Sequence, residues 1–342
     1  MRRLIKILVF GLILSQWVQA QTTPESQYGV PLFSAEVGVV NVTVVALDRN
    51  NRPLQPFGKQ NFKVEERRAG EKNFREVEFN LDLPERLSLR GGIIMDTSGS
   101  TAGQFLYQRD VASEIVKWII KAISNSGRGD KFFVAEFYYE SLDQNPSQGL
   151  FTLKQDWTDN INDLVEAIVR RTKKAAGTSP LFGSVRLAAE KFRTEPGSFA
   201  NFLIVISDGQ NNMSFSGLKD STYMAQAANL PIYTIGTASH DSNKVDPEFL
   251  KNFEQNLKQI SQLTGGRFFD LPAQNKLPEI ARQILQDLRN QYHLNYKLNP
   301  EYNDGDEIEI RVSVGNVGPN GQWRQLSARL LHRKGYRVTK KY

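Results

Sequence analysis

The pattern of hydrophobic and polar positions changes twice along the chain. Residues 36–82 alternate loosely between apolar and polar side chains, as half-buried strands do. Residues 87–290 carry continuous apolar runs, each followed by a segment with helical spacing, and residues 291–342 return to alternation. Runs of apolar residues that alternate with helices predict a parallel sheet covered by helices on both faces. We therefore expect one α/β domain at 87–290, between a β flank at 36–82 and a β flank at 291–342.

The central region contains six apolar runs and six helical patterns. The expected strands are 89–95, 131–139, 150–153, 201–207, 232–235 and 267–270, and the expected helices are 104–124, 159–173, 181–192, 217–229, 247–263 and 277–291. In the first helix, Val111, Ile115, Trp118 and Ile119 form the apolar face. Five aromatic residues of one strand, between Phe132 and Tyr139, are expected to belong to the core.

The two β flanks are each too small to fold alone. The first contains strands near 37–47, 62–64 and 74–79, and the second contains strands near 292–296, 308–314, 326–331 and 336–338. Because three strands do not make a stable sandwich by themselves, we expect the two flanks to pair into one β-sandwich-like base. The central domain would then be inserted between its halves.

The first twenty residues have the pattern of a signal peptide. Arg2, Arg3 and Lys6 precede an apolar stretch, and Val18-Gln19-Ala20 has the small-x-small form of a cleavage site. The apolar run is too short to favour a transmembrane anchor, so cleavage after about Ala20 is expected, followed by an extended segment at 21–35. The chain contains no cysteine, which for an exported protein favours a bacterial envelope, periplasmic or extracellular.

Composition and charge narrow the class of partner. With 40% apolar residues among 342, the chain can bury a core. Its formal charge of +6 falls to about +3 without Arg2, Arg3 and Lys6, and the other basic residues are scattered among acids. Nucleic-acid binding is therefore not expected, and no later stretch is apolar enough to insert stably in a membrane.

Three loops contain a set of oxygen-bearing side chains. Asp96, Ser98 and Ser100 follow the first apolar strand, Thr178 precedes a helix, and Asp208 follows another apolar strand. In α/β sheets, ligands bind beyond the carboxyl ends of the strands. Carboxylates and hydroxyls form the hard-oxygen environment that Mg²⁺ prefers, and Mn²⁺ and Ca²⁺ are alternatives. The three loops together predict a metal site.

This ordered set resembles the metal-ion-dependent adhesion site (MIDAS) of von Willebrand factor type A domains, which have Asp-x-Ser-x-Ser, a distant Thr and a strand that ends in Asp-Gly. The tail motif Lys334-Gly335-Tyr336-Arg337-Val338 and the β flank also resemble bacterial exported VWFA-related proteins. The resemblance implies a Rossmann-like domain. It also implies that Ser98 and Ser100 contact a divalent cation directly and that Thr178 does so directly or through water. Asp96 and Asp208 would bind the cation or hold its waters. A partner protein would supply an acidic side chain to the cation.

Other interpretations remain for the same residues. Any one of these loops could be an ordinary helix cap or turn. A serine protease needs a base beside its nucleophile, and none of His240, His293 and His332 lies in a suggestive context. An enzyme is therefore not expected, and no catalytic residue or other cofactor site is predicted. The alternatives are a metal-dependent hydrolase and a structural envelope component whose cation only braces the loops.

Overall fold

The computed structural model describes residues 38–339 apart from 55, 83–87, 124–128, 140–149, 173–176, 195–198, 214–215, 239–246 and 272–275. The predicted signal peptide, the segment 21–35 and His240 lie outside these residues. None of the described helices is long and apolar enough to cross a membrane.

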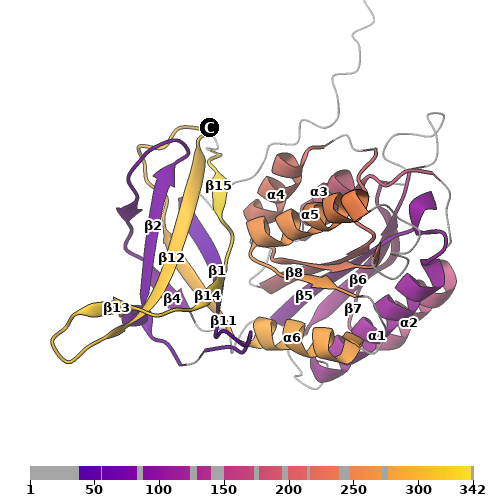
Figure 1. The fold of residues 1–342 in the computed structure, drawn as a ribbon, viewed down its shortest axis with the longest axis horizontal. Coiled ribbons are helices and arrows are strands. Elements are labelled where there is room, and N and C mark those ends of the chain that lie inside the picture. Colours follow the sequence, from indigo (N-terminus) through magenta and orange to yellow (C-terminus); the bar gives the residue numbers. More distant parts are fainter. Residues whose placement is uncertain are drawn as a thin grey trace, which may run out of the picture. The chain divides into compact units, whose positions relative to one another are not determined.

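A six-stranded sheet forms the centre of the α/β region (Figure 1). Its order is β10-β9-β8-β5-β6-β7, and neighbouring strands are parallel except for β6 and β7. The strands are β5 (Ser88–Asp96), β6 (Lys131–Phe137), β7 (Thr152–Thr158), β8 (Phe199–Ser207), β9 (Ile232–Gly236) and β10 (Phe268–Asp270). The prediction of a mainly parallel sheet in a Rossmann-like arrangement is confirmed.

Two adjacent glycines allow the middle of this sheet to pack closely. A Cβ atom on Gly91 would lie 2.5 Å from Cζ of Phe202, and one on Gly92 would lie 2.4 Å from Cζ of Phe133. The space beside β5 is thus filled by aromatic rings from its neighbours, which are buried as the sequence predicted. Any larger side chain at these two positions would displace the packed core.

Six helices cover the two faces of the sheet, with α1, α2 and α6 on one face and α3, α4 and α5 on the other (Figure 1). They are α1 (Phe105–Ile123), α2 (Ile161–Glu166), α3 (Leu181–Arg193), α4 (Leu218–Ala227), α5 (Pro247–Thr264) and α6 (Leu277–Arg289). The expected helix 159–173 is instead α2 followed by a π-helical turn, Ala167–Arg171.

Two details of the predicted elements were wrong. Trp118 is 49% exposed, because the buried face of α1 is centred on Ala112, Ile115 and Ile119 and leaves Trp118 at its edge. The short strand expected at 150–153 is β7, an edge strand antiparallel to β6. Most of its residues are polar and half-exposed, so the search for apolar runs detected only its first residues.

The flanking segments build two antiparallel sheets that share one core (Figure 1). Their orders are β14-β1-β11-β4 and β13-β12-β2-β3, and β15 also pairs with β12. The strands are β1 (Val39–Leu47), β2 (Phe62–Arg68), β3 (Arg75–Glu76), β4 (Asn80–Asp82), β11 (Gln291–Lys297), β12 (Glu307–Val317), β13 (Trp323–Gln325), β14 (Arg329–Leu331) and β15 (Gly335–Arg337). Because β1 pairs with β11 and β2 with β12, the expected sandwich-like base built from both ends of the chain is confirmed.

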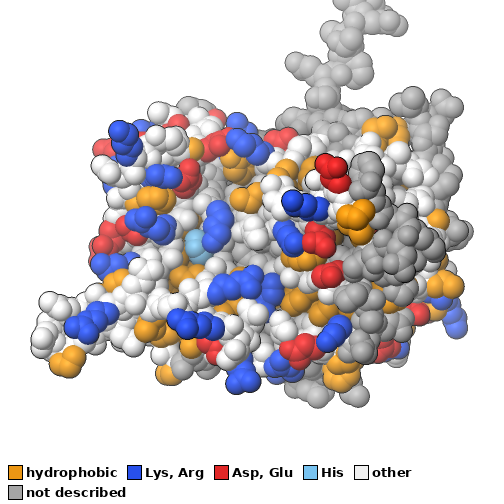
Figure 2. All heavy atoms as spheres, viewed as in Figure 1, with side chains coloured by type: hydrophobic (Ala, Val, Ile, Leu, Met, Phe, Trp, Pro, Cys, Tyr) orange, Lys and Arg blue, Asp and Glu red, His pale blue; other side chains and the backbone are white. Residues whose placement is uncertain are grey.

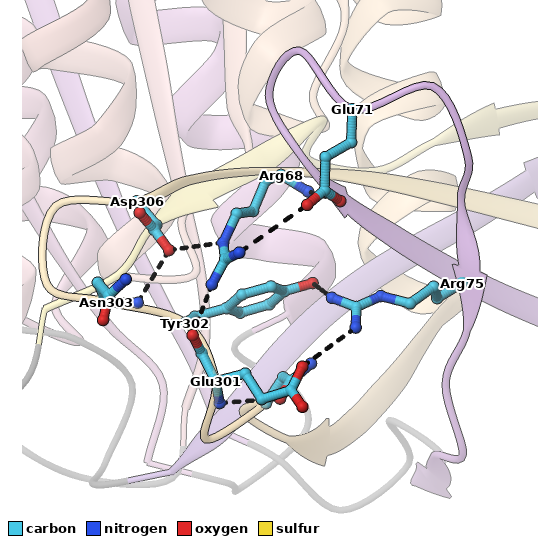
Figure 3. Close-up of polar contacts among 8 residues, drawn as sticks. Arg68, Glu71, Arg75, Glu301, Tyr302, Asn303 and Asp306 are labelled. Atoms are coloured by element: carbon cyan, nitrogen blue, oxygen red, sulfur yellow. Dashed lines mark hydrogen bonds and ion pairs between the residues drawn. The ribbon is translucent and has the colours of Figure 1, made fainter.

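A cluster of polar side chains joins the two halves of this base (Figure 3). Arg68 donates from Nε to the Asp306 carboxylate at 2.8 Å and from Nη2 to the carbonyl of Glu301 at 2.5 Å. Arg75 donates to the hydroxyl of Tyr302 at 3.1 Å. The ion pair between Arg68 and Asp306 is partly exposed, and such pairs add little to the free energy of folding. These contacts nevertheless hold the β2–β3 turn against the loop before β12.

Candidate metal site

Two neighbouring strands bring the predicted carboxylates to one edge of the sheet. β5 ends at Asp96 and β8 ends just before Asp208, and these parallel strands pair directly, with Met95 opposite Ile206. Both carboxylates are buried, Asp96 completely and Asp208 to 4% exposure. The parallel register therefore places two acids in the protein interior at the carboxyl ends of adjacent strands.

The serine hydroxyls connect the two acids. Ser98 donates from Oγ to Oδ1 of Asp96 at 2.6 Å, and its Oγ lies 3.1 Å from that of Ser100. The Ser100 hydroxyl is in turn hydrogen-bonded to Asp208. Four of the predicted residues thus form a continuous chain of oxygen atoms, which begins at the fully buried Asp96 and reaches the surface at the exposed Ser100.

The helix-capping interpretation of Ser98 is not supported. Ser98 stands at the start of a short 3₁₀ turn, Gly99–Thr101, yet its side chain makes no capping hydrogen bond. Its hydroxyl is directed to Asp96 instead. Since a capping serine would accept from a backbone N–H of the following turn, this side chain serves the oxygen cluster and not the turn.

Thr178 reaches the cluster through its backbone. The carbonyl of its neighbour Gly177 accepts from the N–H of Gly99 at 3.0 Å, and Thr178 forms an antiparallel bridge with Tyr139. Its half-buried hydroxyl makes only a long contact of 3.5 Å with the carbonyl of Tyr139. The Thr178 oxygen is therefore held loosely and is available to a further ligand.

Three supporting residues were missed by the sequence reasoning. Ser207 and Ser179 donate to Oδ2 of Asp96 at 2.7 and 3.1 Å. Asn212 accepts from the backbone N–H of Ser179 at 2.7 Å and so connects the loop after β8 to the loop before α3. Ser207 and Ser179 each adjoin a predicted ligand in the sequence, which was the only available signal.

Gly209 shapes the loop that carries Asp208. Its φ is +87°, and a Cβ there would lie 2.3 Å from the backbone oxygen of Phe253 in α5. Asn256 of the same helix donates to the Gly209 carbonyl at 3.0 Å. Only glycine satisfies both the positive φ and this close approach, so the Asp-Gly pair is positioned by α5.

Burial makes ionisation of the two acids costly. Burial, together with the charge of Asp208, raises the pKa of Asp96 to about 7, although hydrogen bonds from Ser207 and Ser98 act in the opposite direction. Burial likewise raises the pKa of Asp208, against the hydrogen bonds from Gln210 and Ser100. Among the described residues, no Lys, Arg or His side chain forms an ion pair with either acid.

These oxygen atoms fit a small divalent cation. With ligands 2.0–2.1 Å from Mg²⁺, adjacent oxygens of an octahedron lie roughly 2.9 Å apart, close to the 3.1 Å between the two serine oxygens. Both oxygens of Asp96 already accept hydrogen bonds, which suits a residue that holds the ligand hydroxyls in place. The described residues contain no cluster of three His, Cys, Asp or Glu side chains, so a cation here would depend on the hydroxyls.

Comparisons with known proteins identify the α/β region. A family model described as von Willebrand factor type A domain matches residues 92–283. The chain is similar in structure to an aerotolerance-related membrane protein from Bacteroides fragilis, at 15% identity and a TM-score of 0.44 over 59% of this chain and 98% of that chain. It is also similar to a von Willebrand factor type A protein from Catenulispora acidiphila, at 14% identity and a TM-score of 0.41 over 81% and 75% of the two chains. A pilus adhesin from Lactobacillus rhamnosus shows 9% identity and a TM-score of 0.45 over 86% and 49%. None of the curated proteins matches the sequence.

Proposed function

This chain belongs to the von Willebrand factor type A domain family, and from that premise we propose that it is a protein-binding module whose interaction depends on a divalent cation. Domains of this family commonly serve in protein–protein interaction and adhesion. The proposed ligands are Ser98, Ser100 and Thr178 with Asp96 and Asp208, and the proposed cation is Mg²⁺, with Mn²⁺ or Ca²⁺ as alternatives.

The observation that carries this proposal is the buried pair of acids without an ion-paired cation among the described residues. Ionised carboxylates in the interior are costly unless a positive charge accompanies them. A bound divalent cation would supply that charge and counteract the burial and the charge of Asp208 that raise the pKa of Asp96. Two carboxylates and three neutral hydroxyls supply five ligands, whereas Mg²⁺ prefers six. A further ligand could therefore bind the cation from outside the chain.

The exposed side of the site suits an acidic partner. Ser100 is exposed and Thr178 is half-buried, whereas Ser98 and Asp96 are closed off from solvent. A carboxylate of a partner protein could therefore approach on the side of Ser100 and Thr178. Ser100 and Thr178 carry neutral hydroxyls, so neither side chain would repel an approaching carboxylate.

A hydrolase using the same cation is less well supported. Of the described histidines, His293 lies in β11 and His332 next to β14, so both belong to the flanking strands and neither to the loops of the site. Among the described residues, no group of three or more His, Cys, Asp or Glu side chains that could hold a metal ion gathers there. A purely structural cation remains the second alternative, which a binding experiment separates. Export to the periplasm or the cell exterior is part of the same proposal and depends on the predicted signal peptide.

Calorimetric titration of Mg²⁺, Mn²⁺ and Ca²⁺ into chelator-treated protein tests the site. We expect saturable binding that is lost in Asp208→Ala and in Ser98→Ala but kept in Asp110→Ala, which removes an exposed acid of α1. If Asp208→Ala binds the cation as the unaltered protein does, the assigned ligands are wrong.

Selection of displayed peptides in Mg²⁺, with elution by chelator, tests the partner chemistry. Enrichment of peptides with an essential Asp or Glu, abolished in Asp208→Ala, is the expected result. Cation binding without any cation-dependent peptide would instead assign the metal a structural role.

A further inference from the structure

A basic cavity lies where the C-terminal strands meet the end of α5. Its volume is about 270 Å³, and its charged lining consists of Lys258, Arg267, Arg329, His332 and Lys334. Residues 333–334 are held there by backbone contacts. The backbone N–H of Lys334 donates to the carbonyl of Leu263 at 3.2 Å, and Arg333 forms an antiparallel β-bridge with Thr264. Figure 2 shows one face of the molecule, on which Lys and Arg side chains lie interspersed with Asp and Glu side chains.

Two of the four cations in the lining are already neutralised. Lys258 pairs with Glu254 at 2.6 Å, and Arg267 pairs with Asp287 at 2.7 Å. Arg329 and Lys334 form no ion pair with any carboxylate of the described residues. The cavity therefore carries two positive charges in excess.

The polar contacts of these two residues leave donors unused. Arg329 donates from Nη1 to the side-chain oxygen of Asn51 at 3.0 Å. Nδ1 of His332 lies 2.7 Å from the carbonyl of Arg333 and must carry the proton, so its Nε2 accepts from the ammonium of Lys334 at 3.3 Å. A Lys ammonium has three N–H groups and a guanidinium has five, so both retain donors for an oxyanion.

A buried donor of the same lining also lacks a partner. The Arg267 side chain is 4% exposed, and its Nε makes no hydrogen bond, although its two other nitrogens are bonded to Gln283 and Asp287. Oδ2 of Asp287 is unpaired as well, but a carboxylate oxygen is an acceptor and would not bind an oxyanion. A buried N–H without a partner is costly, and a ligand oxygen in the cavity is a natural acceptor for it.

Burial adds to the argument from geometry. It lowers the pKa of both Lys334 and Arg329, and the charge of Arg267 contributes at Arg329. Burial also lowers the pKa of His332 to about 3, so the imidazole is neutral and adds no charge of its own. At Arg329 the charge of Asp287 acts in the opposite direction. An anion bound to these cations would offset their loss of hydration.

We infer that this cavity binds a phosphate group, either inorganic phosphate or a phosphate monoester. The excess of two positive charges matches a dianion, and phosphate is mostly doubly charged above pH 7. Guanidinium and ammonium groups are the side chains that proteins use for phosphate oxygens. A carboxylate carries one charge and would leave the second cation uncompensated. This site shares no residue with the proposed cation site and is independent of it.

The test is titration with inorganic phosphate, followed by ³¹P NMR in metal-free buffer at pH 7.5. We expect saturable binding that becomes about tenfold weaker or more in the double variant Arg329→Gln/Lys334→Gln, which removes two charge-assisted contacts. Because both residues are exposed, the variant should keep the thermal unfolding midpoint of the parent. The control Lys297→Gln/Arg324→Gln removes two exposed cations of other strands and should bind as the parent does.

Two further arms define the ligand. Acetate should bind much more weakly than phosphate, and glycerol phosphate compared with inorganic phosphate distinguishes a phosphorylated molecule from the free ion. Equal loss of affinity in both double variants, or acetate binding as tight as phosphate, would overturn the inference. Asp208→Ala should bind phosphate with the affinity of the parent protein. The phosphate result can therefore be interpreted even if the proposed cation site is wrong.

Discussion

The acidic site at the ends of β5 and β8 contains buried charge, whereas the basic cavity at the end of α5 combines one buried cation with two that are exposed. In the acidic site, Asp96 and Asp208 are surrounded by hydroxyls and have no ion-paired cation among the described residues. In the cavity, Arg267 is paired with Asp287, while Arg329 and Lys334 are not paired with any described acid. Each region thus contains charged groups that no described residue of opposite charge pairs with.

The contrast with the Arg267–Asp287 pair shows what such an imbalance means. That pair is almost fully buried and each of its charges has a partner, although burial still raises the pKa of Asp287 to about 7. Burial alone therefore does not indicate a binding site. What the two proposed sites share is charged groups that no described residue of opposite charge pairs with.

The largest expected effect comes from breaking the compensated pair. Asp287→Ala should lower the free energy of unfolding by about 3–5 kcal/mol, since it leaves Arg267 buried without a counter-charge. In chelator, Asp208→Ala should cost far less, because it relieves repulsion with Asp96. Urea unfolding of the two variants measures the difference.

The double variant Arg267→Met/Asp287→Leu provides the control for that comparison. It should recover much of the loss, because apolar residues of similar volume replace a buried pair without unpaired charge. A loss as large in Asp208→Ala as in Asp287→Ala would show that the acidic site is not electrostatically strained.

The next effect concerns pH, and Asp96 and His332 should respond with opposite sign. The pKa of Asp96 is raised to about 7 by folding, so the folded state binds the extra proton and metal-free stability falls as pH rises from about 4 to 7. The pKa of His332 is lowered to about 3, so the unfolded state binds the proton and stability falls as pH drops below about 6.5. Each group contributes at most about 1.4 kcal/mol per pH unit.

Variants of Asp96 and His332 separate these two dependences of the free energy of unfolding on pH. Urea unfolding at several pH values in chelator should show the first slope reduced in Asp96→Asn and the second reduced in His332→Asn. Mg²⁺ should also reduce the first slope, apart from the contribution of Asp287, whose pKa burial raises to about 7, and should leave the second slope unchanged. Parallel pH profiles for the two variants would contradict the comparison.

The smallest effect is expected for a charged pair at the surface. Arg311 donates two hydrogen bonds to Glu65, at 2.7 and 2.8 Å, but its side chain is 51% exposed. Arg311→Met should lower the free energy of unfolding by about 1 kcal/mol or less, including the contact of its guanidinium with the ring of Phe74. Thermal unfolding of this variant beside Arg311→Lys measures it, and a loss near that of Asp287→Ala would show that burial is not the deciding factor.

Much of the fold could be predicted because its signals are local. Apolar runs such as Gly91–Asp96 and the helical spacing in α1 report which residues share one element. The pairing of β1 with β11 was inferable from strand count alone, since the flanks needed each other. The π-helical turn after α2 and the polar edge strand β7 gave no such signal.

The chain alone determined the type of the central sheet and the order in which acids and hydroxyls follow its strands, because both depend on spacing within one element. Only the tertiary structure decided that Ser207 and Ser179 hold Asp96, that α5 fixes Gly209, and that residues 258–268 enclose a cavity with residues 329–334. Those contacts join elements far apart in sequence. Their geometry follows from how the sheets and helices pack, which no pattern along a single element records.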